Sequence, residues 1–131
     1  LMTAPTFLNP KSVAAPQGAY SHVAQVKAAS ETFYISGQVG FAPDGSLPGD
    51  FEGQAEQCFA NIVRILTDLG MTTANLAKLT IYVVQGHPPM AARAARLKVF
   101  GPDVKPASTL VLVPGLVDPK FLIEIEAVAA K

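Results

Sequence analysis

Charged residues are scarce in this chain, which has ten Lys and Arg against ten Asp and Glu and therefore no net charge. They make up 15% of its 131 residues, whereas soluble domains usually carry about 25%. The chain has no excess of basic charge to meet phosphates, so neither nucleic acids nor acidic membrane surfaces are expected as partners. A surface with so few charges favours self-association, and we expect part of it to be buried against copies of the same chain.

Cysteine, histidine and long apolar runs are also sparse. The single cysteine, Cys58, excludes an internal disulfide, and because it lies beside Phe59 in an apolar-periodic segment we interpret it as a core residue. His22 and His87 have no ligand spacing with it, so a metal site is not expected. No run reaches the roughly 18–20 apolar residues of a membrane span and no leader-like segment is recognised, so a cytoplasmic protein is expected.

The apolar half of the sequence is arranged in segments of helical and strand periodicity within one expected domain, residues 1–131. Asp50 is a plausible N-cap and Gly70 a plausible C′ residue for the longer helix, and Gly37 indicates a bulge in a strand. The expected strands are residues 22–28, 32–39, 76–84, 107–113 and 121–129, and the expected helices are residues 51–69 and 90–100. This order predicts an α+β fold, in which both helices cover one face of the sheet and neighbouring subunits cover the other.

Two glutamates in the last expected strand are the most informative polar residues. Glu124 and Glu126 alternate with Ile123 and Ile125, so both project to the face opposite the isoleucines. A solvated sheet face is the simplest interpretation of this pattern. The alternative is that a glutamate lies in a subunit cleft, where it could hold a water molecule and act as a general base.

Other polar residues leave their roles open. Ser108 and Thr109 begin an expected strand, where such hydroxyls more often form sheet or turn hydrogen bonds than attack a substrate. Tyr20 follows a turn and either packs on the first strand or lines a pocket. The glycines match neither a P-loop nor a dinucleotide-binding motif. From the residues alone, the prediction ends at an oligomeric α+β domain.

Four segments nevertheless resemble a known family in their order and spacing. They are residues 16–20 (PQGAY), 34–39 (YISGQV), 105–108 (KPAS) and 123–127 (IEIEA). The pattern is similar to that of the Rid family, the reactive intermediate deaminases, which are also called YjgF-like or L-PSP endoribonuclease-like proteins. The resemblance extends from about residue 16 to residue 129.

This resemblance implies a chorismate-mutase-like (YjgF-like) fold, with a mostly antiparallel sheet of about six strands and two helices on one face. It also implies a homotrimer with clefts between its subunits. Archetypal members hydrolyse enamines and imines such as 2-aminoacrylate to 2-keto acids and ammonia, without a cofactor. In that pattern an arginine binds the substrate carboxylate, a glutamate holds the attacking water, and main-chain groups and a tyrosine complete the pocket.

Carried over by residue, the resemblance implies Glu124 as the catalytic residue. It implies a substrate-binding set of Tyr20, Ser36, Gly37 and Leu110, to which we add Ser108 and Thr109. The arginine does not carry over, because Ser108 stands in its place, and Ala94 stands near the place of an asparagine common on the second helix. A serine hydroxyl offers one neutral hydrogen bond and no counter-charge for a carboxylate.

Two hypotheses follow from this departure. The first is a Rid-family hydrolase or deaminase that acts on an imine, enamine or related amide-like small metabolite, with weak or no activity on 2-aminoacrylate. The alternative is a non-catalytic trimer that binds a small molecule or acts as a chaperone-like protein. Ribonuclease activity, which the older family name suggests, is disfavoured by the neutral charge and the lack of a basic stripe.

Overall fold

Two apolar runs of the sequence form the centre of a four-stranded sheet. β4 (Leu76–Val84) and β6 (Ile123–Ala130) pair antiparallel, and most alternate residues along each strand are buried. β3 (Thr32–Gln38) pairs antiparallel with the other edge of β6, and β5 (Ala107–Val113) pairs parallel with β4. The computed structural model describes residues 4–131, and its main sheet has the strand order β3-β6-β4-β5.

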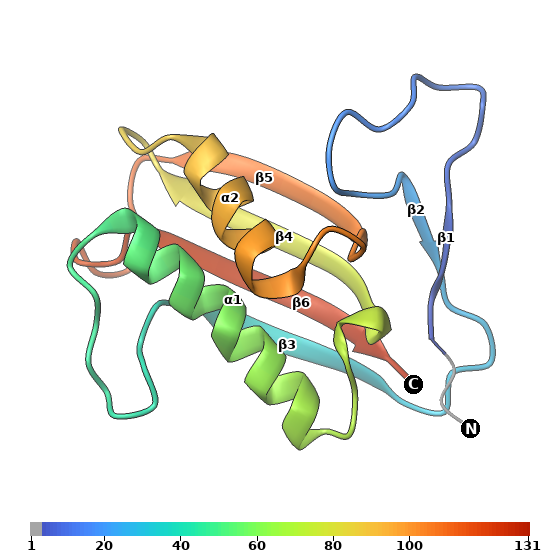
Figure 1. Cartoon of the computed structure of the whole chain (residues 1–131), viewed down its shortest axis with the longest axis horizontal. Coiled ribbons are helices and arrows are strands. Elements are labelled where there is room, and N and C mark those ends of the chain that lie inside the picture. Colours follow the sequence, from blue (N-terminus) through green and yellow to red (C-terminus); the bar gives the residue numbers. More distant parts are fainter. Residues whose placement is uncertain (1–3) are drawn as a thin grey trace.

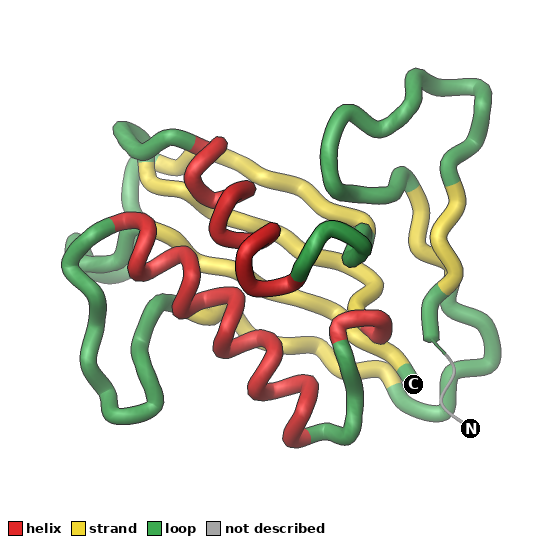
Figure 2. Tube along the Cα trace, viewed as in Figure 1, coloured by secondary structure: helices red, strands yellow, loops and turns green. Residues whose placement is uncertain are grey.

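Two helices lie on one face of this sheet, as Figures 1 and 2 show. α1 (Phe51–Asp68) and α2 (Pro89–Phe100) bury apolar side chains at helical spacing against the buried residues of β4 and β6. Gly70 follows α1 with a φ of 75°, a left-handed conformation that suits glycine. Asp50 takes the N-cap position as expected, but its side chain makes no capping hydrogen bond. The short 3₁₀ helix η1 (Thr73–Asn75) leads from α1 into β4.

The N-terminal strands form a separate ribbon beside the main sheet (Figure 1). β1 (Thr6–Leu8) pairs antiparallel with β2 (Val23–Gln25), so the strand expected at residues 22–28 is only three residues long. Its partner lies in the proline-containing segment that was expected to be extended or irregular. The predicted α+β class, with both helices on one face, is confirmed, and the six strands divide between two sheets.

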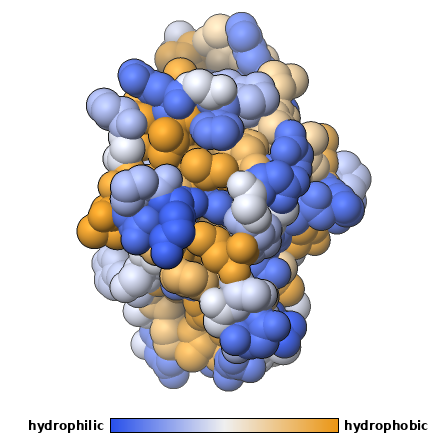
Figure 3. Space-filling view, turned by 90° about the vertical axis from the view of Figure 1, so that its left-hand side faces the viewer, coloured by the Kyte–Doolittle hydropathy of each residue, from blue (hydrophilic) through white to orange (hydrophobic). Residues whose placement is uncertain are grey.

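On the second face of the main sheet, no helix of residues 4–131 is present. Tyr34 of β3 is 81% exposed there and Val111 of β5 is 38% exposed. Apolar side chains also reach the surface elsewhere. At the end that carries the loops before α1 and α2, they lie in several groups among polar ones (Figure 3). Within residues 4–131, no helix has the length and apolar character needed to cross a membrane.

Candidate functional site

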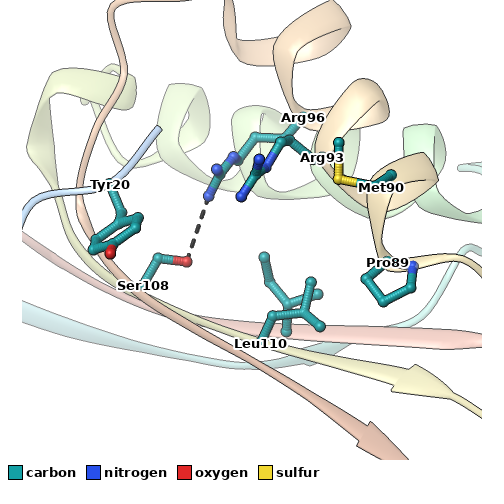
Figure 4. A pocket seen from close by; sticks show the side chains of 8 residues that line it. Tyr20, Pro89, Met90, Arg93, Arg96, Ser108 and Leu110 are labelled. Atoms are coloured by element: carbon teal, nitrogen blue, oxygen red, sulfur yellow. Dashed lines mark hydrogen bonds between the residues drawn. The ribbon is translucent and has the colours of Figure 1, made fainter. Parts of the chain in front are cut away.

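A cavity of about 240 Å³ lies between α2 and the first half of β5. It contains three of the predicted binding residues, namely Tyr20, Ser108 and Leu110. Figure 4 shows their side chains together with those of two arginines, which project from α2. The remaining lining residues are Ile81, Pro89, Met90, Arg93 and Arg96.

The position of Tyr20 is fixed by the chain that follows it. The Ser21 N–H donates a hydrogen bond to the Pro106 carbonyl at 3.1 Å, and the Ser21 hydroxyl donates to the Lys105 carbonyl at 2.7 Å. These bonds attach this segment to the start of β5, where Ser21 forms a parallel bridge with Ala107. The sequence left open whether Tyr20 packs on the first strand or lines a pocket, and in the structure Tyr20 lines the cavity.

Ser108 contacts Arg96, an arginine that was not predicted as a site residue from the sequence. The Arg96 Nη1 donates a hydrogen bond to the Ser108 Oγ at 3.4 Å (Figure 4). Arg96 is only 6% exposed, because it occupies the same buried stripe of α2 as Ala92 and Ala95. Burial lowers the pKa of its guanidinium, and the positive charge of Arg93 lowers it further.

Arg93 lies one helical turn before Arg96 and approaches the same cavity from its rim. Its side chain is exposed, and a Cβ added at Gly18 would lie 2.7 Å from the Arg93 Nη2, so the glycine leaves room for the guanidinium. The sequence did carry a signal for this pair, since two arginines three residues apart share a helix that contains no acidic residue.

Glu124 lies on the other face of the sheet, over a bulge in β3. Its neighbours Ile123 and Ile125 face the helices, and the register between β3 and β6 shifts between Ile35 and Gln38. Gly37 lies in that bulge, and a Cβ there would overlap the Glu124 carboxylate. The bulge expected from Gly37 is therefore present, and it allows the carboxylate to approach the backbone of β3.

Cys58 lies in the core, as the sequence indicated. Its thiol donates to the Gln38 carbonyl at 3.3 Å. Burial raises the pKa of the thiol to about 12, and the charge of Glu124 adds to the increase. A thiol with this pKa stays protonated at neutral pH, so Cys58 is a poor nucleophile and packs as a small apolar residue.

The other predicted polar residues lie on the open face of the sheet. Glu126 accepts a hydrogen bond from the Tyr82 hydroxyl at 2.6 Å, and Thr109 accepts one from the Lys78 ammonium at 2.8 Å. The bond to the Glu126 carboxylate raises the pKa of Tyr82. Ser36 lines a shallow hollow on this face with residues of β4 and β6. Within residues 4–131, no three His, Cys, Asp or Glu residues cluster as a metal site would require.

The structure thus divides the predicted site residues between two faces. Tyr20, Ser108 and Leu110 meet in the cavity under α2. Glu124 and Gly37 meet on the opposite side of the sheet, and Ser36 and Thr109 also lie on that open face. These two groups are not brought together within one chain.

Comparisons with known proteins place this architecture in a family. The family model described as Endoribonuclease L-PSP matches residues 11–131. A RutC family protein of Pyrococcus horikoshii is 34% identical over 119 residues, which cover 88% of this chain and 90% of that protein. A RutC family protein of Aquifex aeolicus is 38% identical over 69 residues, so that match spans about half of each chain, 52% and 53%.

Solved structures give the same result. YyfB of Yersinia pestis, a Rid family protein of unknown function, superimposes with a TM-score of 0.84 at 32% identity, covering 97% of this chain and 98% of its own. A putative endoribonuclease of Thermotoga maritima has a TM-score of 0.69 at 27% identity, with coverages of 96% and 97%. The resemblance noted in the four sequence segments is confirmed by these matches. The chain belongs to the Rid (YjgF-like) family, whose family model is described as Endoribonuclease L-PSP.

Proposed function

We propose that this chain is a Rid-family hydrolase or deaminase that acts, without a cofactor, on an imine, enamine or related amide-like bond of a small metabolite. The observation that carries the proposal is the position of the Glu124 carboxylate and its lack of a protein partner in the described residues. It lies over the backbone at Gly37, and no hydrogen bond or ion pair to it is found within residues 4–131. Glu126, two residues away, is instead held by Tyr82.

A carboxylate without a protein partner is suited to hold and activate water. The water oxygen attacks the carbon of a C=N bond while Glu124 accepts a proton from the water, and the substrate nitrogen is protonated. The resulting carbinolamine then loses ammonia and leaves a carbonyl group, so one water is consumed for each ammonia released. General-base assistance of this kind contributes about 10²- to 10⁴-fold to a rate.

A complete site requires a second copy of the chain. Tyr20 and Ser108 lie in the cavity under α2, whereas Glu124 lies on the open face of the same sheet. Because the two faces of one sheet cannot meet, the cavity of one subunit must be joined to the Glu124 of another. The homotrimer implied by the family resemblance supplies such a cleft.

The replacement at Ser108 bears on the choice of substrate. On β5 the chain presents a neutral hydroxyl where the family pattern has an arginine, so the strand supplies no positive charge at the place where that pattern holds the carboxylate. We expect weak or no turnover of 2-aminoacrylate, because its carboxylate is attached directly to the reacting carbon and a small error in its placement reduces the rate strongly.

Ammonia release from imines generated in situ by an amino acid oxidase, and from 2-aminoacrylate generated by a dehydratase, tests the proposed activity. We expect accelerated hydrolysis of at least one imine and a loss of about 100-fold or more in Glu124→Gln. Glu126→Gln is the matched control, since it removes the same charge from the same face and should retain activity. The proposal fails if no imine is hydrolysed faster than in buffer, or if Glu124→Gln is as active as the unmodified protein.

The division of the site also favours a second candidate, a trimer that binds a small molecule without converting it. In one chain the cavity that holds Tyr20 and Ser108 is complete without Glu124. Saturable binding of a keto acid, amide or aromatic acid, together with no turnover of any related imine, would support this alternative.

A further inference from the structure

The charges that line the cavity under α2 are all of one sign. The chain has three arginines, and two of them, Arg93 and Arg96, line this cavity. The other lining residues are neutral, and α2 itself contains no acidic residue. The ion pair found within residues 4–131 joins Lys98 to Glu56 and involves neither arginine.

This arrangement is costly in the empty protein. A buried guanidinium normally has a carboxylate partner, because moving an unpaired charge out of water is unfavourable. Arg96 is 6% exposed, and its Nη1 makes a 3.4 Å bond to a neutral hydroxyl. Its Nε has no hydrogen-bond partner among residues 4–131. Arg93, three residues earlier on the same helix, adds repulsion. An anion in the cavity would compensate both costs.

We propose that Arg93 and Arg96 of α2, with the Ser108 hydroxyl, bind the carboxylate of a small organic acid in this cavity. The guanidinium that Ser108 lacks on β5 is then supplied from the helix above it. Arg96 already reaches the Ser108 Oγ, so its charge lies beside the position from which a strand arginine would project (Figure 4). Guanidinium groups match the planar, two-oxygen geometry of a carboxylate.

The rest of the cavity limits what the acid can be. Ile81, Met90 and Leu110 form an apolar wall beside the arginines, which suits a short hydrocarbon chain rather than a free inorganic anion. The part of the cavity that one chain forms has a volume of about 240 Å³, below the roughly 300–1,000 Å³ of pockets for drug-sized ligands. We therefore assign the cavity to acids of a few carbon atoms. This assignment deepens the proposed function by naming its substrate class.

Calorimetric titration of the full chain tests the assignment without any turnover. The probes are 2-oxobutanoate, its uncharged amide, benzoate and inorganic phosphate. We expect saturable binding of 2-oxobutanoate, and binding of the amide that is about 10- to 100-fold weaker, because a charge-assisted contact is lost. Binding should shift the amide resonances of Ser108 and Leu110.

Three arginine variants provide the internal comparison. Arg93→Met and Arg96→Met should each weaken 2-oxobutanoate binding about tenfold or more. Arg64→Met should leave this binding unchanged, because Arg64, the third arginine of the chain, lies on α1 and does not line the cavity. Arg93 is exposed, so its variant keeps the test valid even if Arg96→Met does not fold. The assignment is overturned if neither carboxylate binds, if the amide binds equally well, if the Arg93 and Arg96 variants bind as the unmodified protein does, or if phosphate binds more tightly than both carboxylates.

The titration also separates this assignment from the proposed function. Arg93 and Arg96, and not Glu124, are assigned to the carboxylate. Glu124→Gln should therefore keep arginine-dependent binding of 2-oxobutanoate, even where the Glu124 of a neighbouring subunit faces the cavity. Arginine-dependent binding without hydrolysis of any imine would sustain the carboxylate site and refute the hydrolase. Imine hydrolysis without arginine-dependent binding would sustain the hydrolase and refute the carboxylate site.

Discussion

At the scale of single residues, Arg96 is a buried charge placed where a helix ordinarily presents an apolar side chain. It shares the buried stripe of α2 with Ala92, Ala95 and Phe100. Its guanidinium donates a hydrogen bond to the Ser108 hydroxyl, and its Nε has no hydrogen-bond partner in the described part of the chain. A binding site that holds such a group gives up some folding stability in exchange for affinity.

Replacing Arg96 with methionine should therefore stabilise the protein in the absence of ligand. Methionine keeps much of the side-chain length and removes the desolvated charge, a type of change that is often neutral or stabilising. We expect the free energy of unfolding to rise by about 1 kcal/mol and the Tm by about 3 °C. Urea and thermal unfolding measure this directly.

The exposed Arg64 provides the comparison, since Arg64→Met should change stability by less than about 0.5 kcal/mol. A loss of more than about 1 kcal/mol in Arg96→Met would show that the guanidinium supports the fold, and the cost assigned to its burial would be wrong.

The sequence predicted some of these residues and not others. Cys58 was predicted to be buried because it follows helical periodicity beside apolar neighbours, and the structure confirms it. The exchange at Ser108 was visible from the family pattern. Arg96 was not identified, because amphipathic patterns assign charged residues to the solvent face of a helix. Its reach to Ser108 depends on how α2 packs across β5, which no local pattern specifies.

At the scale of elements, the bulge in β3 determines how closely Glu124 approaches the backbone. Gly37 has no side chain, and a Cβ there would overlap the end of the Glu124 side chain. The backbone at this position does not require glycine, because its φ is not positive. The glycine therefore makes room for the carboxylate and is not required by the backbone conformation of the bulge.

Gly37→Ala should separate activity from stability. The added methyl group displaces the flexible end of Glu124, so we expect activity on the imine substrate to fall about 100-fold, since small displacements of a reacting group have large effects on rate. The Tm should change by only a few degrees. Gly49→Ala is the matched control, because Gly49 also lacks a positive φ and has open space around its missing Cβ. Full activity in Gly37→Ala would argue against the proposed position of the carboxylate.

Element boundaries were predicted best where the local composition is typical of a strand. β4 and β5 begin and end at the expected residues, because both are rich in β-branched and apolar side chains. β2 is shorter than expected because its length is set by pairing with the three residues of β1, a segment that was expected to be extended or irregular. The position of Asp50 before α1 was predicted, but the absence of a capping bond depends on a side-chain rotamer.

At the scale of the whole molecule, the open face of the main sheet is not covered by a helix of residues 4–131, and it exposes apolar side chains among polar ones such as Glu126 and Lys78. Tyr34 and Val111 are exposed on it, at opposite edges of the main sheet. The carboxylate of Glu124 lies on this same face, whereas the cavity with Arg96 lies beneath α2. Association through the open face would cover the apolar surface and bring Glu124 of one subunit toward the cavity of another.

A homotrimer built in this way should have a mass of roughly 41 kDa, three times the 13.7 kDa of one chain. Sedimentation equilibrium measures this mass.

Tyr34→Glu and Val111→Glu place a charge in the buried interface and should shift the protein toward monomer, because an unpaired charge at the centre of an interface is strongly disfavoured. Leu97→Glu on α2 is the matched control, since Leu97 is 42% exposed, close to the 38% of Val111, and lies on the helical side. Imine hydrolysis should be lost with the trimer in the two interface variants, because Glu124 and the cavity then stay on separate faces. A monomeric mass for the unmodified chain, or trimers that survive both substitutions, would rule out the open face as the interface.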